Sequence, residues 1–440
     1  MLAVVVSRAD RASEHIGEQL LALDQWTERT DADRSDAEGG GTYYTTDGIE
    51  LRTFEELHLH LDDTAAAFSD PDLLFFASRH SGDTGALLTA HATGNFGPAE
   101  FGGTDGDLAR AAPNALADLL VAFDRHAPDE YGVGMECTHH GPSEVGCPSL
   151  FVELGSSDEQ WDDSAGAEAV ARAVLDVRDA APDRERQLVG FGGGHYVPRF
   201  ERVVRETDWA VGHVAADWGL DDMGHPREAT ETVEQAFEQS AAEVALVDGD
   251  HPVLREVVAD LGYRVVSETW VRETSAVPLD TVERAEAALC PVDDGLRFGA
   301  PAAGHDGEFA VVELPAELTE EATNVDPDAA RAAVADRAVA FETVENGTRP
   351  RGRAALAAAS RDDLVCALAD VLREGYDEVT VAEDRVVARE EAFDPAKAKT
   401  LGIEEGPAFG KLAAGESVEV RGREIDPERV RTAREVEFPR

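Results

Sequence analysis

The sequence predicts an α/β protein, namely a three-layer α/β/α sandwich around a mixed, mostly parallel sheet, followed by a smaller α+β domain. Short apolar runs typical of buried strands alternate with stretches of helical period over roughly the first 270 residues. The chain has 440 residues, of which 43% are hydrophobic, enough to give each of two domains its own core. Strands that alternate with helices favour a sheet whose strands run largely parallel.

The first expected elements are a buried strand over residues 2–6 and a helix over about 9–23, whose apolar positions Ile16, Leu20 and Leu23 follow the helical period. The polar stretch over residues 27–41 is expected to be a loop. Further strands are expected in apolar runs within residues 56–61, 72–80, 86–95, 131–140, 149–156, 187–195, 209–217, 243–250 and 264–270. Helices are expected over 108–126, 164–177, 229–241 and 252–261.

A stretch rich in Gly, Pro and Asp then interrupts this pattern over about residues 290–309. We therefore expect a first domain over residues 1–288, a linker over 289–309 and a C-terminal accessory domain over 310–440, with helices near 328–340 and 361–373. His305 is the last histidine, so any metal or acid/base site is expected in the first domain.

The formal net charge is −51, from 39 basic and 90 acidic residues, and only Lys397, Lys399 and Lys411 are lysines. Acidic side chains in every segment, with Arg in place of Lys, indicate a halophilic protein. In molar salt the Debye length is about 3 Å, so this charge does not exclude nucleic acid as a partner. A disordered acidic chain is the alternative, but here the acids are interleaved with apolar residues that disordered segments lack.

The four cysteines have no CxxC spacing, which argues against a disulfide framework. The N-terminal apolar run has only five residues and lacks a basic flank, and no apolar run of about 18 residues follows. We expect a soluble, cytoplasmic protein with no membrane contact.

Histidines and one glutamate follow the predicted strands at five places. A single histidine of this kind is more often structural, but ligands of α/β proteins bind beyond the carboxyl ends of strands, and neutral imidazole is a common zinc ligand. We therefore favour a metal site, in which a carboxylate would be a ligand or a general base. The residues are His80, His91, the group of Glu136, His139 and His140, then His195 and His213.

Other residues near these segments could contact a substrate. The turn before His195 contains Gly193 and Gly194, whose backbone N–H groups could stabilise an oxyanion, although a tight turn explains them equally. Arg79 and Arg199 could bind phosphate, or pair with some of the many acids. Thr93 and Asn95 could be hydrogen-bond donors or could cap a helix, and Cys137 suits a small buried thiol better than a ligand.

Four stretches taken together resemble the archaeal and plant type of D-aminoacyl-tRNA deacylase, in its haloarchaeal form. They are "FFASRHSGDTGALLTAHATGNFGPAEFGG", "MECTHHGPSEVGCPSLFVELGSSDEQW", "GFGGGHYVPRF" and "VGHV", in the same order as in that family, and the resemblance covers about residues 1–275. The matching positions are Arg79, His80, His91, Thr93, Gly94, Asn95, Glu136, Thr138, His139, His140, Gly141, Pro142, Glu153, Gly193, Gly194, His195, Tyr196, Gly212 and His213.

The resemblance implies a fold similar to the phosphorylase/peptidyl-tRNA hydrolase group, zinc as cofactor with two ions per subunit, and hydrolysis of the ester that joins a D-amino acid to tRNA. The expected partners are tRNA and the D-amino acid moiety, and we expect a monomer. His80, His139, His195 and His213 are the candidate zinc ligands, and Glu136, His140, Asn95, Gly193 and Gly194 the candidate catalytic groups. Substrate binding is assigned to Arg79, His91, Thr93, Tyr196 and Arg199.

The sequence departs from the family pattern at two places. Cys137 stands where alanine is expected, which weakens a thiolate role, and residues 214–220 lack the expected basic and aromatic continuation. The C-terminal region looks like an addition to the family core. Its residues 394–430 contain all three lysines and resemble a segment of tRNA 3′-processing endonucleases of the ribonuclease Z type, although an ordinary strand-turn unit would also explain them.

Three other classes of protein are alternatives to the deacylase. A zinc-dependent peptidase or amidohydrolase on a related α/β fold would use the same His and Glu residues. A non-catalytic tRNA-binding protein would need few acid/base groups in its cleft, and the histidines at strand ends count against it. A relative of the nucleoside phosphorylases would need a phosphate pocket.

Overall fold

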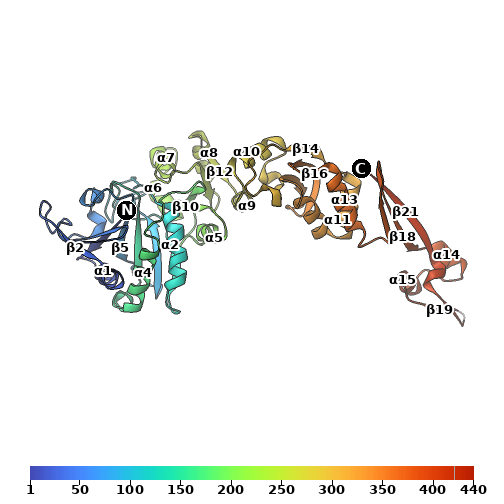
Figure 1. The fold of residues 1–440 in the computed structure, drawn as a ribbon, viewed down its shortest axis with the longest axis horizontal. Helices are drawn as coiled ribbons and strands as arrows, with labels where there is room; N and C mark the ends of the chain where they lie inside the picture. Colours follow the sequence, from blue (N-terminus) through green and yellow to red (C-terminus); the bar gives the residue numbers. More distant parts are fainter. Residues whose placement is uncertain (421) are drawn as a thin grey trace. The chain divides into compact units, whose positions relative to one another are not determined.

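The structure, a computed structural model, describes residues 1–420 and 422–440, which form two compact units, Met1–Ser275 and Ala276–Arg440 (Figure 1). The expected linker over 289–309 lies inside the second unit. There β13 (Leu296–Phe298) pairs with β15 (Ala340–Val344), and the side chains of Val292 and Leu296 are buried. The glycines and prolines of this stretch therefore form turns within a folded domain, and the boundary between the units falls earlier than expected.

The first unit contains a large mixed sheet with the strand order β2-β3-β4-β1-β5-β8-β6-β7. The central strands β4, β1, β5 and β8 are parallel, as are β6 and β7, whereas β8 pairs antiparallel with β6, and β2, β3 and β4 are antiparallel neighbours. This confirms a large, mostly parallel sheet. The strands are β1 (Leu2–Ser7), β2 (Thr27–Asp31), β3 (Gly41–Thr46), β4 (Ile49–Phe54), β5 (Leu73–Arg79), β6 (Leu87–Ala92), β7 (Gly132–Met135) and β8 (Ser149–Gly155).

Two predictions near the N-terminus were wrong. The expected loop over residues 27–41 contains β2, an edge strand whose polar side chains are mostly exposed and so gave no apolar signal. Residues 56–61, expected to be a strand, contain instead a short 3-10 helix, His58–His60. The strand in this part of the chain is β4, which the sequence did not predict because it contains charged side chains that are buried. Arg52 Nε donates to Glu50 at 2.6 Å, and Arg52 Nη1 donates to Asp31 at 2.8 Å.

Helices cover one face of the large sheet, where α4 (Ser164–Asp176) lies between α1 (Arg11–Leu23) and α2 (Pro113–His126). On the opposite face, buried residues of β1, β5 and β8 pack instead against loops and the 3-10 segment Thr64–Ala67. The third helical layer predicted for this sheet is therefore replaced by loops. Asp10 caps α1, because its carboxylate accepts the backbone N–H groups of Ala12 and Ser13.

A second, fully parallel sheet in the first unit has the order β10-β9-β11-β12. Val189 and Phe191 pack on Val233 and Phe237 of α7 on one face. Gly190 on the other face lies against α5, where an added Cβ would come within 2.7 Å of the Phe200 ring. The remaining strands and helices of the first unit are β9 (Gln187–Phe191), β10 (Ala210–Ala215), β11 (Val244–Val247), β12 (Arg264–Val266), α5 (Pro198–Glu206), α6 (Asp217–Met223), α7 (Thr230–Gln239), α8 (Pro252–Asp260), α9 (Glu268–Glu273) and, beside β8 of the large sheet, α3 (Asp158–Trp161).

The two sheets meet at the segment that follows β7. Cys137 N donates to the His195 carbonyl at 2.9 Å, and Thr138 N donates to the Val214 carbonyl at 2.9 Å. These bonds bring the end of β7 beside the turn after β9 and beside β10. Histidine-bearing segments far apart in the sequence therefore become neighbours.

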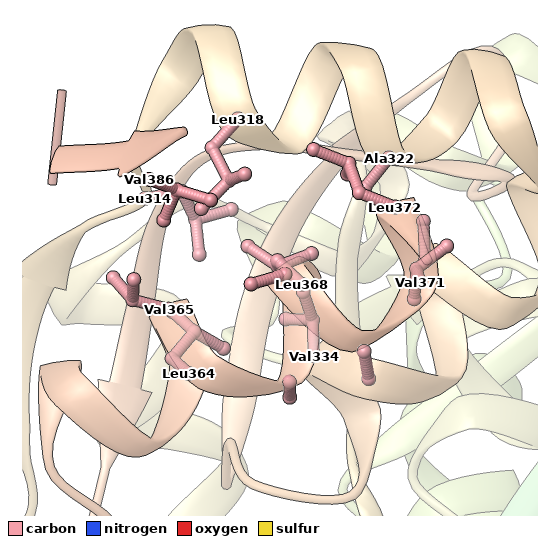
Figure 2. Packing of buried hydrophobic residues seen from close by; sticks show 14 of the residues in the cluster. Leu314, Leu318, Ala322, Val334, Leu364, Val365, Leu368, Val371, Leu372 and Val386 are labelled. Carbon is pink, nitrogen blue, oxygen red and sulfur yellow. The ribbon is translucent and has the colours of Figure 1, made fainter. Parts of the chain in front are cut away.

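The second unit is α+β, as predicted for the C-terminal domain. Its antiparallel sheet, in the order β13-β15-β16-β14, packs against α11, α12 and α13, and Figure 2 shows Leu318, Val334 and Leu368 among the buried residues of this core. The segment that connects the paired strands β18 and β21 in sequence, residues 394–430, has a small core formed by residues such as Ile403, Leu412 and Val430. The further elements are α10 (Leu279–Ala288), β14 (Ala310–Glu313), α11 (Ala316–Val325), α12 (Pro327–Ala335), β16 (Arg349–Leu356), α13 (Arg361–Leu372), β17 (Glu378–Val381), β18 (Arg385–Phe393), α14 (Pro395–Thr400), α15 (Pro407–Ala413), β19 (Val418–Val420), β20 (Arg423–Ile425) and β21 (Arg431–Pro439). Among the described residues, no helix has both the length and the apolar character that a membrane crossing requires.

Two helical valines allow a matched test of this packing. Val170 on α4 is fully buried, whereas Val121 on α2 is 56% exposed. We expect Val170→Ala to lower the free energy of unfolding of the first unit by about 1–3 kcal/mol, because it removes buried methyl groups. Val121→Ala should change it by less than about 0.5 kcal/mol. All five tryptophans lie before residue 276, so tryptophan fluorescence during urea unfolding at constant KCl reports this unit alone; equal values for the two variants would contradict the packing.

Candidate active site

A cavity of about 490 Å³ opens where β5, β7 and the turn after β9 end, a size typical of small-molecule sites. β5 leads into His80, β7 leads into Glu136, and β9 leads into the glycine turn before His195. The turn requires glycine at Gly192, which has φ +90° and whose added Cβ would lie 1.9 Å from the Asp248 carbonyl oxygen. The polar residues lining the cavity include His80, Glu136, His139, His140, Glu153, His195, Tyr196, Arg79, Ser78, His58 and Asp10.

Three histidines form the densest part of the site. His91 on β6 lies beside His139 and His140, with ring centroids 4.3–4.6 Å apart. In each ring Nδ1 faces a backbone carbonyl: that of Ala92 at 2.9 Å for His91, that of Cys137 at 2.9 Å for His139, and that of Gly141 at 3.3 Å for His140. A carbonyl oxygen only accepts, so Nδ1 carries the proton in all three rings and Nε2 is left with its lone pair.

Glu136 is the centre of a second group. Its Oε2 accepts a hydrogen bond from His195 Nε2 at 2.7 Å, and its Oε1 lies 3.6 Å from His80 Nε2. His80 is held by Ser156, whose Oγ is 2.9 Å from Nδ1, and by the Tyr196 hydroxyl, 3.2 Å from Nε2. The carboxylate and two imidazoles therefore converge from three separate strand ends.

Burial and neighbouring charges set the protonation of these groups. Burial lowers the pKa of His139 and His140 well below the usual value, and the neighbouring histidines add to this, so both rings are neutral. Burial alone would raise the pKa of Glu136, but the hydrogen bond from His195 and nearby positive charge hold it below its usual value. Glu136 is therefore ionised at neutral pH and can accept a proton.

Glu153 on β8 adds a second buried carboxylate, whose Oε1 lies 3.8 Å from His91 Nε2 and 3.9 Å from His140 Nε2. Burial raises the pKa of Glu153. Burial lowers the pKa of His91, but Glu153 raises it by more, and the net direction is upward. Glu153 therefore favours positive charge at His91 Nε2, from a proton or from a metal ion.

The donor set fits a metal ion. The ligand atoms of His91, His139 and His140 lie within 4.8 Å of one another, and the same holds for His80, Glu136 and His195, and for Cys137, His139 and His195. His91 Nε2 and Glu136 Oε1 are buried without a hydrogen-bond partner among the described residues. Three imidazoles held by backbone carbonyls through Nδ1 are typical of a zinc site. Burial and the charge of Glu136 raise the pKa of Cys137 to about 12, which keeps it a thiol, as the sequence suggested.

His213 does not join the site, contrary to its assignment as a ligand. Its Nε2 donates to the Ala109 carbonyl at 2.8 Å, and its Nδ1 lies 3.1 Å from Thr138 Oγ1, so both ring nitrogens have partners. The ring is fully buried, and burial lowers its pKa to about 4. It is a neutral core residue that supports the segment after β7.

Five other predicted site residues, Thr93, Asn95, Gly193, Gly194 and Arg199, are not among the residues that line the cavity. Thr93 Oγ1 lies 3.0 Å from Ser149 Oγ, and the Asn95 amide donates to the Gly102 carbonyl at 2.9 Å. Arg199 pairs with Asp248 and Glu268, which was the alternative weighed for it. Gly193 and Gly194 form the turn before His195, where an added Cβ on Gly193 would lie 3.0 Å from Asp248 Oδ2, and their role as oxyanion donors stays a prediction.

Arg79 and Tyr196 line the cavity as expected of substrate contacts, and the Arg79 guanidinium lies over the Trp161 ring at 5.3 Å. The family resemblance included Glu153 among its matching positions without a role, and sequence reasoning singled out neither Asp10 nor His58. A lone glutamate within the apolar stretch "SLFVELG" was the available signal for Glu153. Asp10 reads as an ordinary helix cap, and His58 lies in a segment mistaken for a strand, so neither gave a signal.

Comparison with known proteins supports the sequence resemblance. A family model described as D-aminoacyl-tRNA deacylase matches residues 67–266. A protein named D-aminoacyl-tRNA deacylase from Natronomonas pharaonis is 58% identical over 441 residues, covering 100% of both chains. One of the same name from Haloarcula marismortui is 53% identical over 445 residues, covering 99% of both. A solved crystal structure of a conserved protein of unknown function is 30% identical, with a TM-score of 0.56, and covers 62% of this chain and 98% of that one.

The similarity to the haloarchaeal relatives extends through the C-terminal unit, so this unit is not an addition peculiar to the present chain. The haloarchaeal sources also agree with the halophilic composition. More than half of the positions of this chain are identical to those of relatives named D-aminoacyl-tRNA deacylase, along nearly the full length of both chains. The chain therefore belongs to the D-aminoacyl-tRNA deacylase family.

Proposed function

We propose that the protein hydrolyses the ester bond of D-aminoacyl-tRNA and releases the free D-amino acid and tRNA, so that mischarged D-amino acids are removed. The observation that carries the proposal is the group of His91, His139 and His140 beside Glu136, in a cavity of about 490 Å³. Relatives that bear the name of this activity span the whole chain. The activity would be cytoplasmic, where aminoacyl-tRNA is used, and the enzyme would be a monomer on a fold of the phosphorylase/peptidyl-tRNA hydrolase kind.

The cofactor of the proposed enzyme is zinc, held by the Nε2 atoms of His91, His139 and His140. When bound, zinc lowers the pKa of a water molecule to about 7 and polarises a carbonyl group. The family resemblance implies a second ion, for which His80, Glu136 and His195 are the available ligands. The first group is better prepared, because its Nε2 atoms are free, whereas His195 donates Nε2 to Glu136.

Glu136 is the proposed general base. Its carboxylate is ionised, its Oε1 has no hydrogen-bond partner among the described residues, and His195 fixes the other oxygen. Glu136 would take one proton from the attacking water while a C–O bond forms at the ester carbon. The ester bond to the ribose oxygen then breaks, and a proton returned through Glu136 and His195 neutralises that oxygen. Arg79 at the rim would contact a phosphate of the tRNA end.

The first test compares release of tyrosine from D-tyrosyl-tRNA and L-tyrosyl-tRNA in molar KCl. We expect hydrolysis that favours the D form, falls after chelation and returns when zinc is added. Hydrolysis that is unaffected by chelation would support the deacylase activity but would contradict the proposed role of zinc. Absence of hydrolysis by folded, zinc-loaded protein, together with cleavage of a blocked peptide, would support the peptidase alternative instead.

Glu136→Gln tests the general base. The amide keeps the size of the side chain but cannot accept a proton at neutral pH, so we expect kcat for D-tyrosyl-tRNA to fall by about 100-fold or more. Glu18→Gln is the matched control, because Glu18 is exposed on α1, and it should retain full activity. Similar kcat values for the two variants would exclude Glu136 from catalysis.

Zinc content separates the ligands from the core histidine. We expect His91→Ala to lose zinc, measured by atomic emission on purified protein, because it removes one of three imidazoles. His213→Gln should keep its zinc, because both ring nitrogens of His213 are bonded within the protein. The reverse result, with zinc lost only from His213→Gln, would return His213 to the ligand set.

A further inference from the structure

His58 lies in the wall of the cavity, outside the two groups of candidate ligands. The 3-10 helix His58–His60 places it there, with 2% of its surface exposed. Its ring packs on Phe76 and Phe151, with centroid distances of 6.3 and 5.1 Å. Phe151 also contacts His140, with a centroid distance of 4.6 Å, so His58 and the three-histidine group share one phenylalanine neighbour.

The surroundings of His58 determine which ring nitrogen carries the proton. Its Nε2 lies 2.8 Å from Ser78 Oγ and 3.8 Å from Asp10 Oδ2. The Ser78 hydroxyl donates its proton to the Arg79 carbonyl at 3.4 Å, and the Asp10 carboxylate can only accept. Both oxygen atoms near His58 Nε2 are therefore acceptors, and Nε2 is the donor. Burial, assisted by the charge of Arg79, lowers the pKa of His58 to about 3, so the ring is neutral and its single proton is on Nε2.

His58 Nδ1 is therefore a hydrogen-bond acceptor, and it is buried without a partner among the described residues. Unsatisfied buried acceptors are uncommon, because each loses its hydration without replacement. Its counterpart should be a donor brought into the cavity by a ligand. The ionised Glu136 carboxylate on the same cavity favours a donor that is also positively charged.

We propose that His58 Nδ1 accepts a hydrogen bond from the α-amino group of the aminoacyl ester, an inference that rests on the proposed deacylase function. The α-amino group has N–H donors in both its ammonium and its amine form. It lies two bonds from the ester carbon, and His58 and the three-histidine group contact the same Phe151 ring.

This contact makes His58 a specificity-determining residue. With the ester carbonyl held at the histidine group and the amino group at His58, the two enantiomers direct their side chains to different walls of the cavity. One wall, formed by Leu57, Leu59 and Phe101, is apolar. An enzyme without the amino anchor would discriminate less between D and L esters.

The test uses two variants and two esters on the full-length, zinc-loaded protein. In glutamine the terminal amide is as many bonds from Cα as His58 Nε2, so His58→Gln can keep the Ser78 contact while losing the Nδ1 acceptor. In His58→Asn the amide stands at the position of Nδ1. The substrates are D-tyrosyl-tRNA and 3-(4-hydroxyphenyl)propionyl-tRNA, which is the same ester without the amino group.

We expect His58→Gln to lower kcat/KM for D-tyrosyl-tRNA by about 10- to 100-fold, the range for a hydrogen bond to a charged group, and to reduce the preference for D over L esters. The same variant should leave kcat/KM for the desamino ester within about twofold of its wild-type value, and His58→Asn should lose less than His58→Gln on D-tyrosyl-tRNA.

Equal losses on the two esters would overturn the inference, because they would show that His58 only supports the packing of the cavity wall. An unchanged kcat/KM for D-tyrosyl-tRNA in His58→Gln would also overturn it. If the wild-type protein hydrolysed neither ester, the proposed deacylase function would fail, and the inference would fail with it.

Discussion

The site depends on the backbone contact between the two sheets of the first unit. The hydrogen bonds from Cys137 N to the His195 carbonyl and from Thr138 N to the Val214 carbonyl fix the segment after β7 against the turn after β9. Glu136 and His195 follow strands of two separate sheets, so without this contact their 2.7 Å hydrogen bond could not form. His213 supports the same segment through Thr138, which explains a buried histidine there without any metal.

The cluster concentrates polar groups where burial is costly. Each unsatisfied buried polar atom costs about 1–3 kcal/mol, and His91 Nε2, Glu136 Oε1 and His58 Nδ1 are three such atoms in one small region. The surrounding structure resists their collapse: backbone carbonyls orient three imidazoles through Nδ1, and Phe151 packs against His58, His91 and His140. A binding site requires such rigidly held acceptors without partners before its ligand binds.

The overall negative charge and the chemistry of the cavity are separate matters. The acids that line the cavity are Asp10, Glu136 and Glu153, whereas the net charge of −51 reflects acidic side chains spread over the whole sequence. In concentrated salt their field is screened within about 3 Å, so a polyanionic substrate can approach. Partly buried pairs such as Glu136 with His195 are screened much less, so they determine the local electrostatics of the cavity.

The sequence alone determined the α/β class, most strands and helices of the first unit, and the presence of histidines at several strand ends. These features are local, because they depend on the spacing of apolar residues and on the residue that follows each strand. It misjudged β2, β4 and His58, where exposed polar or buried charged side chains conceal the strand pattern. Only the tertiary structure decided which histidines meet. His91 joined His139 and His140, and His213 left the set, because the partners of a ring nitrogen come from residues distant in sequence. Family motifs could match all of these positions, but they could not separate the histidines with free nitrogens from the one that supports the fold.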